Sequence, residues 1–495
     1  GDFASIARSK SKREQVMTTK NGQLNDGREV YLNGHRVVDM ASEYVFSKTL
    51  AVIQRYYDLQ TENKNHTFFS NGIEASVMFL APKTVKDLAK KRQIYEEVAR
   101  ESYGMLGRTP DFINAGVAVL GNYADDLGTQ GKIDFAFNAK NWVNRVKFDD
   151  VFVSHAIQNP QLNRQKTLSQ LLDEGQEFAG VWIKETREDG VIVRGAKQVN
   201  TLAPLADELL IFNLPDLKSV DQKFALAFAL PIATPGVKVI CRKPTMKSDY
   251  SLADYPLSQA FDEMDAFLLF DDVFVPNEAL FVCGNVAQSN AFFEASGLFN
   301  HTAHQDEVRG FVELEFVTGI AVRLAKQLGL FGFQRVQEKL GELSVNLELI
   351  RSCIVASEVT GKMQKGVFTP NMQTLLAVRA KLTTYYDEAL RVIAEFSAGS
   401  AVGVPDFREF SNPNIAEMLE SALTSDLMSA EERMLLLNLA WDITSESFGQ
   451  RQRVYEFLHG GNPMFIHLQH LKHTDLTQAN EMIDKVLDNA RHGKK

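Results

Sequence analysis

The sequence predicts an α+β protein in which a mainly helical zone, a β zone and a second helical zone follow one another. Three observations support this prediction. Apolar residues recur at helical spacing early in the chain, short β-like runs without long helices fill the middle, and long helical patterns return afterwards. A chain of 495 residues is too long for one simple core. We therefore expect three domains, over residues 1–150, 151–276 and 277–495.

The first zone is predicted to be helical because apolar residues recur at three- and four-residue spacing over Met40–Leu59 and over Val85–Tyr103. Glycine and proline then interrupt the pattern, and a further helix is expected to start near Asp111. The segment Gly107–Phe112, GRTPDF, is therefore expected to form a turn that presents Arg108.

The middle zone contains runs that are typical of β-strands. Two of them, FAGVWIKETRE and GVIVRGAKQV, meet at Asp189-Gly190, a pair that favours a hairpin turn with positive φ at both residues. No helix long enough for a crossover separates the runs, so we expect an antiparallel sheet or small barrel. We also expect a flexible loop between Pro204 and Lys223 that closes over a ligand. The further runs are Glu208–Phe212, Phe224–Ile232, Val237–Cys241 and Phe267–Val275.

The last zone is predicted to form a helical bundle. Apolar residues from Val336 to Ile354 alternate at spacings of four and three, and Phe311–Leu330 and Thr374–Phe396 are two more long helices. Such bundles often build subunit interfaces. The charged tail Glu481–Lys495 is expected to be mobile or covered by a partner.

Composition narrows the classes of function. A net charge of −10 argues against nucleic-acid binding. The sequence contains no run of 18 apolar residues, which is the length that a membrane-spanning helix needs. The N-terminal segment GDFASIARSKSKREQ lacks the apolar core of a signal peptide. With three widely separated cysteines, these features favour a reducing, cytoplasmic compartment.

The sequence contains no motif that indicates a metal site or a nucleotide site. His467, His470 and His473 share a drifting helical face, but no acid or cysteine stands at ligand spacing, so we predict no metal site. The cysteines lack the spacing of an iron–sulfur cluster. The chain has no GxGxxG motif, so a Rossmann site for NAD(P)H is not indicated.

Two loop segments carry the strongest chemical signal. The first presents Arg108, and the second, SHAIQNPQLNR, offers His155 before a polar loop that ends in Arg164. A cation and an imidazole in such loops suit an acidic hydroxyl and a flavin. Taken alone, Arg108 is better explained by an ion pair with Asp111, and His155 by a buried structural role.

The order of the zones is similar to the acyl-CoA dehydrogenase architecture, with a middle β domain and a C-terminal four-helix bundle. The string FLLFDDVFVPNEAL resembles the end of that middle domain. A more specific resemblance, over nearly the whole chain, is to the 4-hydroxyphenylacetate 3-hydroxylase family. It rests on several strings in the same order: DGREVYLNGHRVVD, SYGMLGRTPDF, SHAIQNPQLNR, GVIVRGAKQVNTLAPLADE, YPLSQAFDEMDA, WDITSESFGQRQRVYE and HGGNP.

This resemblance implies the oxygenase of a two-component, FADH2-dependent aromatic monooxygenase. Such an enzyme hydroxylates a phenol, typically in the ortho position, with O2 and through a flavin C4a-hydroperoxide. A separate NAD(P)H:flavin reductase would supply the reduced flavin, and FMNH2 stays open as an alternative to FADH2. A homotetramer or a homodimer is also expected.

The resemblance also implies roles for particular residues. Arg108 would contact the substrate and stabilise a phenolate, and His155 would accept the phenol proton. The flavin would be bound by loop residues of both halves of the chain: His155, Ala156, Ile157, Gln161, Leu162, Asn163, Arg164, Thr201, Gly460, Gly461, Asn462 and Pro463.

Phe112 departs from the family pattern, which has a tyrosine that hydrogen-bonds the substrate hydroxyl. Losing that donor removes about 1 kcal/mol of hydrogen bonding. Either Arg108 and His155 hold the substrate alone, or the substrate is not the usual hydroxyphenyl acid. The second hypothesis is therefore a flavin-binding oxidase, dehydrogenase or scaffold with altered, non-phenol chemistry.

The 4-hydroxybutyryl-CoA dehydratases share this architecture and hold an iron–sulfur cluster with cysteines and a histidine. No cysteine lies near Arg108, and none follows closely after His301 and His304 in this sequence. The sequence therefore argues against that chemistry.

Overall fold

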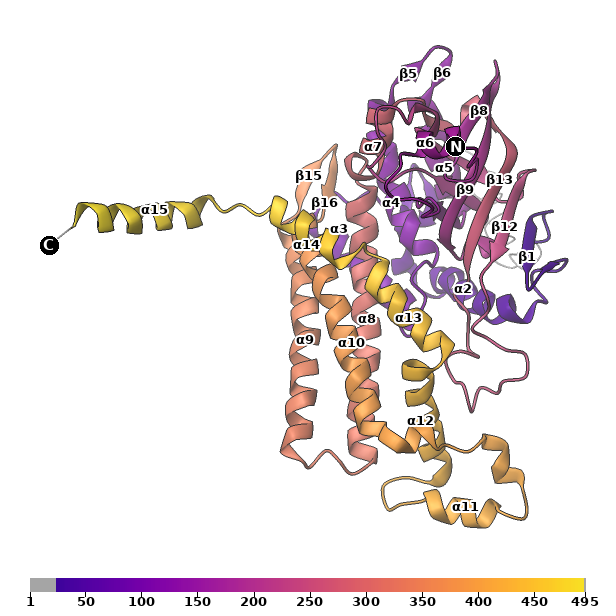
Figure 1. Cartoon of the computed structure of the whole chain (residues 1–495), viewed down its shortest axis with the longest axis vertical. Helices are drawn as coiled ribbons and strands as arrows, with labels where there is room; N and C mark the ends of the chain where they lie inside the picture. The colour runs from indigo at the N-terminus through magenta and orange to yellow at the C-terminus, as the bar shows by residue number, and fades with distance from the viewer. Residues whose placement is uncertain (1–23, 494–495) are drawn as a thin grey trace.

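Figure 1 shows the computed structural model, which describes residues 24–493. The N-terminal segment whose composition argues against a signal peptide lies outside the described residues. Among the described helices, none combines the length and the apolar character needed to cross a membrane.

Helices of the first zone follow the predicted patterns. Helix α3 starts after Thr84 with a capping box to Asp87, and α4 starts with Pro110, a residue well suited to a first helical position. The predicted helices are thus confirmed. The helices are α2 (Tyr44–Glu62), α3 (Val85–Arg100), α4 (Pro110–Tyr123) and α5 (Phe135–Asp149), with hairpins β3 (Thr67–Ser70) to β4 (Ile73–Ser76) and β5 (Thr129–Gln130) to β6 (Ile133–Asp134) between them.

Two sheets form the middle of the molecule. One has the strand order β2-β1-β12-β13-β9-β8, and the other has the order β14-β11-β10-β7. The first contains β1 (Glu29–Leu32), β2 (His35–Arg36), β8 (Trp182–Thr186), β9 (Gly190–Thr201), β12 (Val237–Cys241) and β13 (Asp265–Pro276). The second contains β7 (Val153–Ala156), β10 (Glu208–Ile211), β11 (Leu226–Pro231) and β14 (Leu280–Cys283).

The predicted antiparallel pairing is confirmed for the runs expected in the middle zone, since β8–β9, β9–β13, β12–β13 and β10–β11 are all antiparallel. Two further strands, β1 and β7, add parallel pairs. Strand β1 runs parallel to β12, and β7 runs parallel to β10. Both pairs join strands that are far apart in sequence, which the local pattern of neighbouring runs does not show. Strands β1, β2 and β14 lie outside residues 151–276 but join these sheets. The domain boundaries at 150 and 276 stay a prediction.

The hairpin from β8 to β9 is confirmed, but the expected turn geometry is wrong. Neither Asp189 nor Gly190 has a positive φ. Gly190 is already the first residue of β9, and a Cβ there would lie 2.3 Å from the carbonyl oxygen of Val275. Glycine is needed here for close packing between strands and not for the turn.

The stretch between Pro204 and Lys223, expected to be a flexible loop, is a loop only in its second part, where residues 214–221 are irregular and mostly exposed. The first part contains β10, in which all four residues are buried. Because β10 pairs with β7 on one side and β11 on the other, it is a central strand of the smaller sheet.

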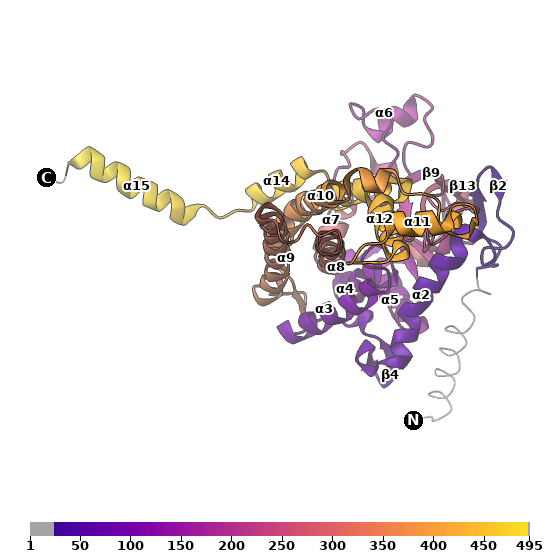
Figure 2. The same ribbon diagram turned by 90° about the horizontal axis from the view of Figure 1, so that it is seen from below.

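The last zone confirms the predicted bundle. Helices α8, α9 and α10 lie side by side, and α12 packs on α10 (Figure 1). Seen from below, α8 lies between α4 and the pair α9 and α10 (Figure 2). The bundle contains α8 (Leu298–Gln327), α9 (Gln334–Val359), α10 (Met372–Val402) and α12 (Ala430–Ser445). The remaining elements of this zone are α7 (Val286–Ala295), β15 (Lys362–Gln364), β16 (Val367–Thr369), α11 (Ala416–Leu423), α13 (Ser447–Leu458), α14 (Pro463–Lys472) and α15 (Thr477–His492). Helix α6 (Leu168–Asp173) belongs to the middle zone and packs on Trp182 of β8.

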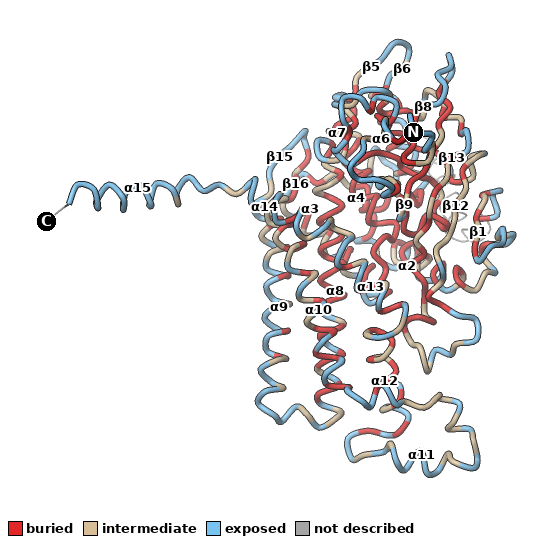
Figure 3. The backbone as a smooth tube through the Cα atoms, in the orientation of Figure 1, coloured by how far each residue is buried: buried red, intermediate tan, exposed pale blue. Residues whose placement is uncertain are grey.

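Helix α8 begins at Leu298, well before the predicted Phe311. All residues from His301 to Leu314 are buried, although several are charged. A helix buried on all sides has no amphipathic pattern, which is why the sequence did not reveal its first half. In Figure 3 α8 is largely red, whereas α15 is pale blue and carries no buried residue.

Candidate functional site

Arg108 lies in the turn before α4 and is buried. Its Nη1 donates to Asp306 Oδ1 at 3.2 Å and to the carbonyl oxygen of Gly107 at 3.2 Å. The alternative pairing with Asp111 is not formed, because the carboxylate of Asp111 accepts hydrogen bonds from Thr109 and Gln305. Nε and Nη2 of Arg108 have no hydrogen-bond partner among residues 24–493, so both remain available to a ligand.

Phe112 and His155 lie against this arginine. The guanidinium carbon of Arg108 is 3.8 Å from the centre of the Phe112 ring, a favourable cation–π distance. The rings of Phe112 and His155 have centroids 5.3 Å apart. The structure therefore brings together the three residues for which the sequence suggested contact with a substrate.

His155 lies on β7 and stays neutral over the physiological pH range. Burial and the neighbouring charge of Arg108 lower the pKa of its imidazole to about 3, although Asp306 acts in the opposite direction. Within the part of the chain that the structure describes, neither ring nitrogen has a hydrogen-bond partner. A neutral imidazole with free nitrogens is suited to accept a hydrogen bond from a ligand hydroxyl.

The polar loop after β7 is anchored at its start and open further along. Lys197 Nζ donates to the carbonyl oxygen of Ile157 at 2.8 Å and to Asn159 Oδ1 at 3.0 Å. Residues Gln161–Arg164 are exposed, and Arg164 has no ion-pair partner among the described residues. Ala156 is buried in β7. The loop thus offers a free cation close in sequence to His155.

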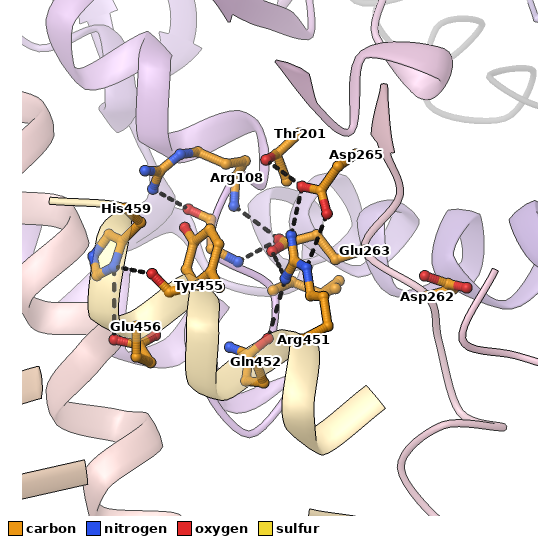
Figure 4. A network of polar contacts seen from close by, with 12 residues as sticks. Arg108, Thr201, Asp262, Glu263, Asp265, Arg451, Gln452, Tyr455, Glu456 and His459 are labelled. Atoms are coloured by element: carbon orange, nitrogen blue, oxygen red, sulfur yellow. Dashed lines mark hydrogen bonds and ion pairs between the residues drawn. The ribbon is translucent and has the colours of Figure 1, made fainter. Parts of the chain in front are cut away.

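Thr201 is engaged inside the protein. Its hydroxyl donates to Asp265 Oδ1 at 2.7 Å, and Arg451 Nη2 donates to the same oxygen at 2.7 Å (Figure 4). Burial alone would raise the pKa of Asp265, but Arg451 and Arg242 outweigh it and hold that pKa well below its usual range. Asp265 therefore remains a carboxylate that fixes Thr201.

Glu263 positions the turn of Arg108. One carboxylate oxygen accepts hydrogen bonds from the backbone N–H groups of Gly107 and Arg108, and the other accepts from Arg451 Nη1 at 2.9 Å (Figure 4). The sequence analysis assigned no role to Glu263 or Arg451. Both lie in strings that carried the family resemblance, which was the signal available for them.

Gly107 allows this turn to pack on Tyr455. A Cβ at Gly107 would lie 1.9 Å from the Tyr455 hydroxyl oxygen. Gly107→Ala is therefore expected to destabilise the fold by about 1–3 kcal/mol, because Tyr455 must move. Urea unfolding monitored by circular dichroism measures the change.

Gly121→Ala, in the last turn of α4, is the matched control, because a Cβ there meets Val143 at an ordinary 3.5 Å. Equal unfolding midpoints for the two variants would show that the turn tolerates a side chain.

The turn His459–Pro463 lies on the other side of Asp306. His459 Nε2 donates to Asp306 Oδ2 at 2.6 Å, and Arg379 Nη1 donates to the carbonyl oxygen of Gly460 at 3.1 Å. Gly461 has a φ of 106°, which suits glycine, and the side chain of Asn462 caps α14, with Pro463 at its first position. His459, Gly460 and Gly461 border a small pocket that also includes Arg379 and Glu307.

Asp306 was not identified from the sequence, because it lies in the half of α8 that has no amphipathic pattern. Burial would raise the pKa of its carboxyl, but His459, Arg108 and Arg309 hold that pKa well below its usual range. Next to it, burial raises the pKa of Glu307 to about 8 despite Arg379. The pKa values of these two neighbouring carboxyl groups are therefore shifted in opposite directions, that of Asp306 down and that of Glu307 up.

Metal binding has no support in this region. Between residues 24 and 493 no three His, Cys, Asp or Glu side chains are grouped so that they could hold a metal ion. His470, one of the three histidines in the HLQHLKH run, instead accepts a hydrogen bond at its carbonyl oxygen from Gln373.

The order of a helical part, two sheets and a helical bundle defines a class of fold: proteins of acyl-CoA dehydrogenase-like architecture. Two family models cover most of the chain. The model for the 4-hydroxyphenylacetate 3-hydroxylase N terminal matches residues 21–282, and the model for its C terminal matches residues 289–488. The chain therefore belongs to the 4-hydroxyphenylacetate 3-hydroxylase family.

Characterised relatives agree with this assignment. The chain is 34% identical over 439 residues to the 4-hydroxyphenylacetate 3-monooxygenase oxygenase component of Thermus thermophilus, with 88% of this chain and 89% of the relative covered. It is also 30% identical to a Streptomyces globisporus monooxygenase that acts on a carrier-bound (3S)-3-amino-3-(3-chloro-4-hydroxyphenyl)propanoyl group, with 89% and 83% covered.

Solved structures confirm the fold class. The oxygenase component of 4-hydroxyphenylacetate 3-monooxygenase complexed with FAD has a TM-score of 0.90, 32% identity, and coverage of 97% of this chain and 99% of that one. The same values describe its complex with FAD and 4-hydroxyphenylacetate. Glutaryl-coenzyme A dehydrogenase has a TM-score of 0.53 at 14% identity, with 97% and 96% covered, and shares the fold alone.

Proposed function

We propose that this chain is the oxygenase component of a two-component FADH2-dependent monooxygenase that hydroxylates a phenolic substrate, typically in the ortho position. The observation that carries the proposal is the pairing of Arg108, with two unpaired N–H groups, and the partner-free imidazole of His155 around the ring of Phe112. Relatives named as oxygenase components support the need for a separate reductase.

The residues present fit a flavin. Imidazole nitrogens without partners, a free cation at Arg164 and a glycine turn at Gly460–Gly461 offer the donors and the backbone access that a planar, anionic cofactor needs. His155, Ala156, Ile157, Gln161 to Arg164 and the turn to Pro463 would hold it. Thr201 would have to leave Asp265 to take part through its hydroxyl. When bound, reduced flavin supplies the activation of O2.

The protein's own contribution is to hold the phenol in its reactive form. Arg108 donates from Nε or Nη2 to the phenol oxygen and lowers the cost of the phenolate, which is the more nucleophilic form of the ring. His155 accepts the hydrogen bond of the phenol. A phenolate beside His155 offsets the charge of Arg108 and so raises the pKa of the imidazole from about 3.

A single-turnover experiment tests this function. Anaerobically reduced FAD is bound to the protein and then mixed with oxygen and a panel of phenols, and the products are analysed by mass spectrometry. We expect a product with one added oxygen atom for at least one phenol. Flavin binding without an oxygenated product from any phenol would favour the alternative, an oxidase or dehydrogenase with non-phenol chemistry.

Phenylalanine at position 112, in place of the family tyrosine, is the feature that favours this alternative. Phe112→Tyr is expected to lower the Kd of a phenol about fivefold, because a new hydroxyl next to Arg108 and His155 adds one hydrogen bond of about 1 kcal/mol. Titration of the anaerobic complex measures the Kd, with the methyl ether of the same phenol as control. Weaker phenol binding would show that the ring edge at 112 does not face the substrate oxygen.

We also propose that the protein forms an oligomer and that a separate reductase supplies its reduced flavin. We propose a homotetramer or homodimer, supported by helix α15, which extends away from the body with its apolar residues exposed (Figure 1). Light scattering after size exclusion tests this, and a monomer at micromolar concentration would contradict it.

A further inference from the structure

Asp306 connects two parts of the site that are far apart in the chain. Its carboxylate is fully buried on α8. Oδ1 accepts from Arg108 Nη1 at 3.2 Å, and Oδ2 accepts from His459 Nε2 at 2.6 Å. His459 Nδ1 lies 2.9 Å from the carbonyl oxygen of Tyr455, so both nitrogens of this ring are engaged within the protein.

Arg379 forms a second connection on the same side. Its Nη2 lies 3.4 Å from Asp306 Oδ2, its Nη1 donates to the carbonyl oxygen of Gly460 at 3.1 Å, and its Nε donates to Glu307 Oε1 at 2.7 Å. The turn after α13 is therefore held to Asp306 both by a side chain of its own and by an arginine from α10.

We propose that Asp306 is a positioning residue that couples the aromatic ligand at Arg108 to the flavin at the turn His459–Pro463; this inference rests on the proposed function. One carboxylate fixes the guanidinium that would bind the phenol and also the turn that would bind the cofactor. Removing its charge frees both, so each ligand must then order its own part of the site on binding.

Glu358 is a buried acid outside the site and serves as the comparison for a purely structural role. Glu358 on α9 is also buried and also accepts from an arginine and a histidine, Arg92 Nε at 2.8 Å and His304 Nε2 at 2.9 Å. None of these three residues forms a hydrogen bond or an ion pair with Arg108 or with the turn at 459–463 in the described part of the chain. Glu358→Gln is therefore a matched control for Asp306→Asn.

The experiment measures two dissociation constants on the full-length protein under anaerobic conditions, one for reduced FAD and one for 4-hydroxyphenylacetate. Asp306→Asn is expected to raise both about tenfold or more, since each connection is a charge-assisted hydrogen bond. Glu358→Gln is expected to change neither Kd more than twofold, although it should lower Tm by about as much as Asp306→Asn does. Two double variants test the coupling further. Arg108→Gln should not change the Kd of the aromatic ligand by the same factor in Asp306→Asn as in the wild type, and the same should hold for His459→Gln and the Kd of FAD.

The outcomes are distinct. A wild-type protein that binds both ligands, with Asp306→Asn weakening only one or neither, overturns the coupling and leaves the proposed function standing. A wild-type protein that binds neither ligand overturns the proposed function and this inference together. If Asp306→Asn does not fold, His459→Gln replaces it: it should raise the Kd of 4-hydroxyphenylacetate about threefold through Asp306, and an unchanged Kd overturns the coupling.

Discussion

Replacing Arg108 with glutamine is expected to lower kcat/KM for a phenolic substrate at least 100-fold. The guanidinium is the buried cation with unpaired N–H groups beside His155, and a transition state that develops negative charge on the phenol oxygen loses its main stabilisation without it. Removing one such preorganised donor costs on the order of 3–4 kcal/mol. Steady-state kinetics with a saturating supply of reduced flavin measures the effect.

The control for this variant is Arg100→Gln on α3. Arg100 is exposed and pairs with Glu96 at 3.3 Å and Glu315 at 3.0 Å, away from the site. Exposed pairs of this kind contribute little, so its kinetics should match the wild type. A comparable loss of kcat/KM in both variants would contradict a specific role for Arg108.

Replacing His155 with alanine is expected to abolish product formation, to below 1% of the wild-type kcat, while some flavin binding remains. The imidazole is the acceptor for the phenol hydrogen, but the flavin has further contacts in the proposed loops. Product analysis and flavin titration separate the two effects, and His467→Ala, at an exposed position on α14, is the control. Full product formation in His155→Ala would contradict the assigned role.

Because the pKa of His155 is lowered by folding, the free energy of unfolding is expected to depend on pH. Its pKa is about 3 in the folded protein and near the ordinary 6.5 when unfolded. Between these values the unfolded state binds more protons, so the stabilisation linked to neutral His155 is lost as pH falls from 6.5 towards 3. The difference in the free energy of unfolding between wild type and His155→Gln should therefore shrink over this window in urea titrations. Parallel pH profiles would show that His155 is not desolvated.

Much of the fold and part of the site could be predicted because their signals are local. The helical spacing over Val85–Tyr103, the helical pattern that starts near Asp111 and the strand runs each concern neighbouring residues, and each predicted an observed element. The residues Arg108, Phe112 and His155 were identified by their chemistry and by family resemblance, and the structure brings them into contact.

Other features could not be predicted because they depend on residues that are distant in sequence. The parallel pairs β1–β12 and β7–β10 are examples, and so is the burial of β10, which follows from its place between two strands. Helix α8 was only half predicted, since a helix buried on all sides shows no polar face.

By itself the sequence determined the class of the fold and the two loops that carry the chemistry, since periodicity, turn residues and motif order are properties of the chain. Only the tertiary structure decided which partners these loops have. Arg108 pairs with Asp306 across 198 positions and not with Asp111, and Glu263 reaches its backbone across 155. It also decided that His155 stays neutral, because that depends on desolvation and on a charge brought near only by folding.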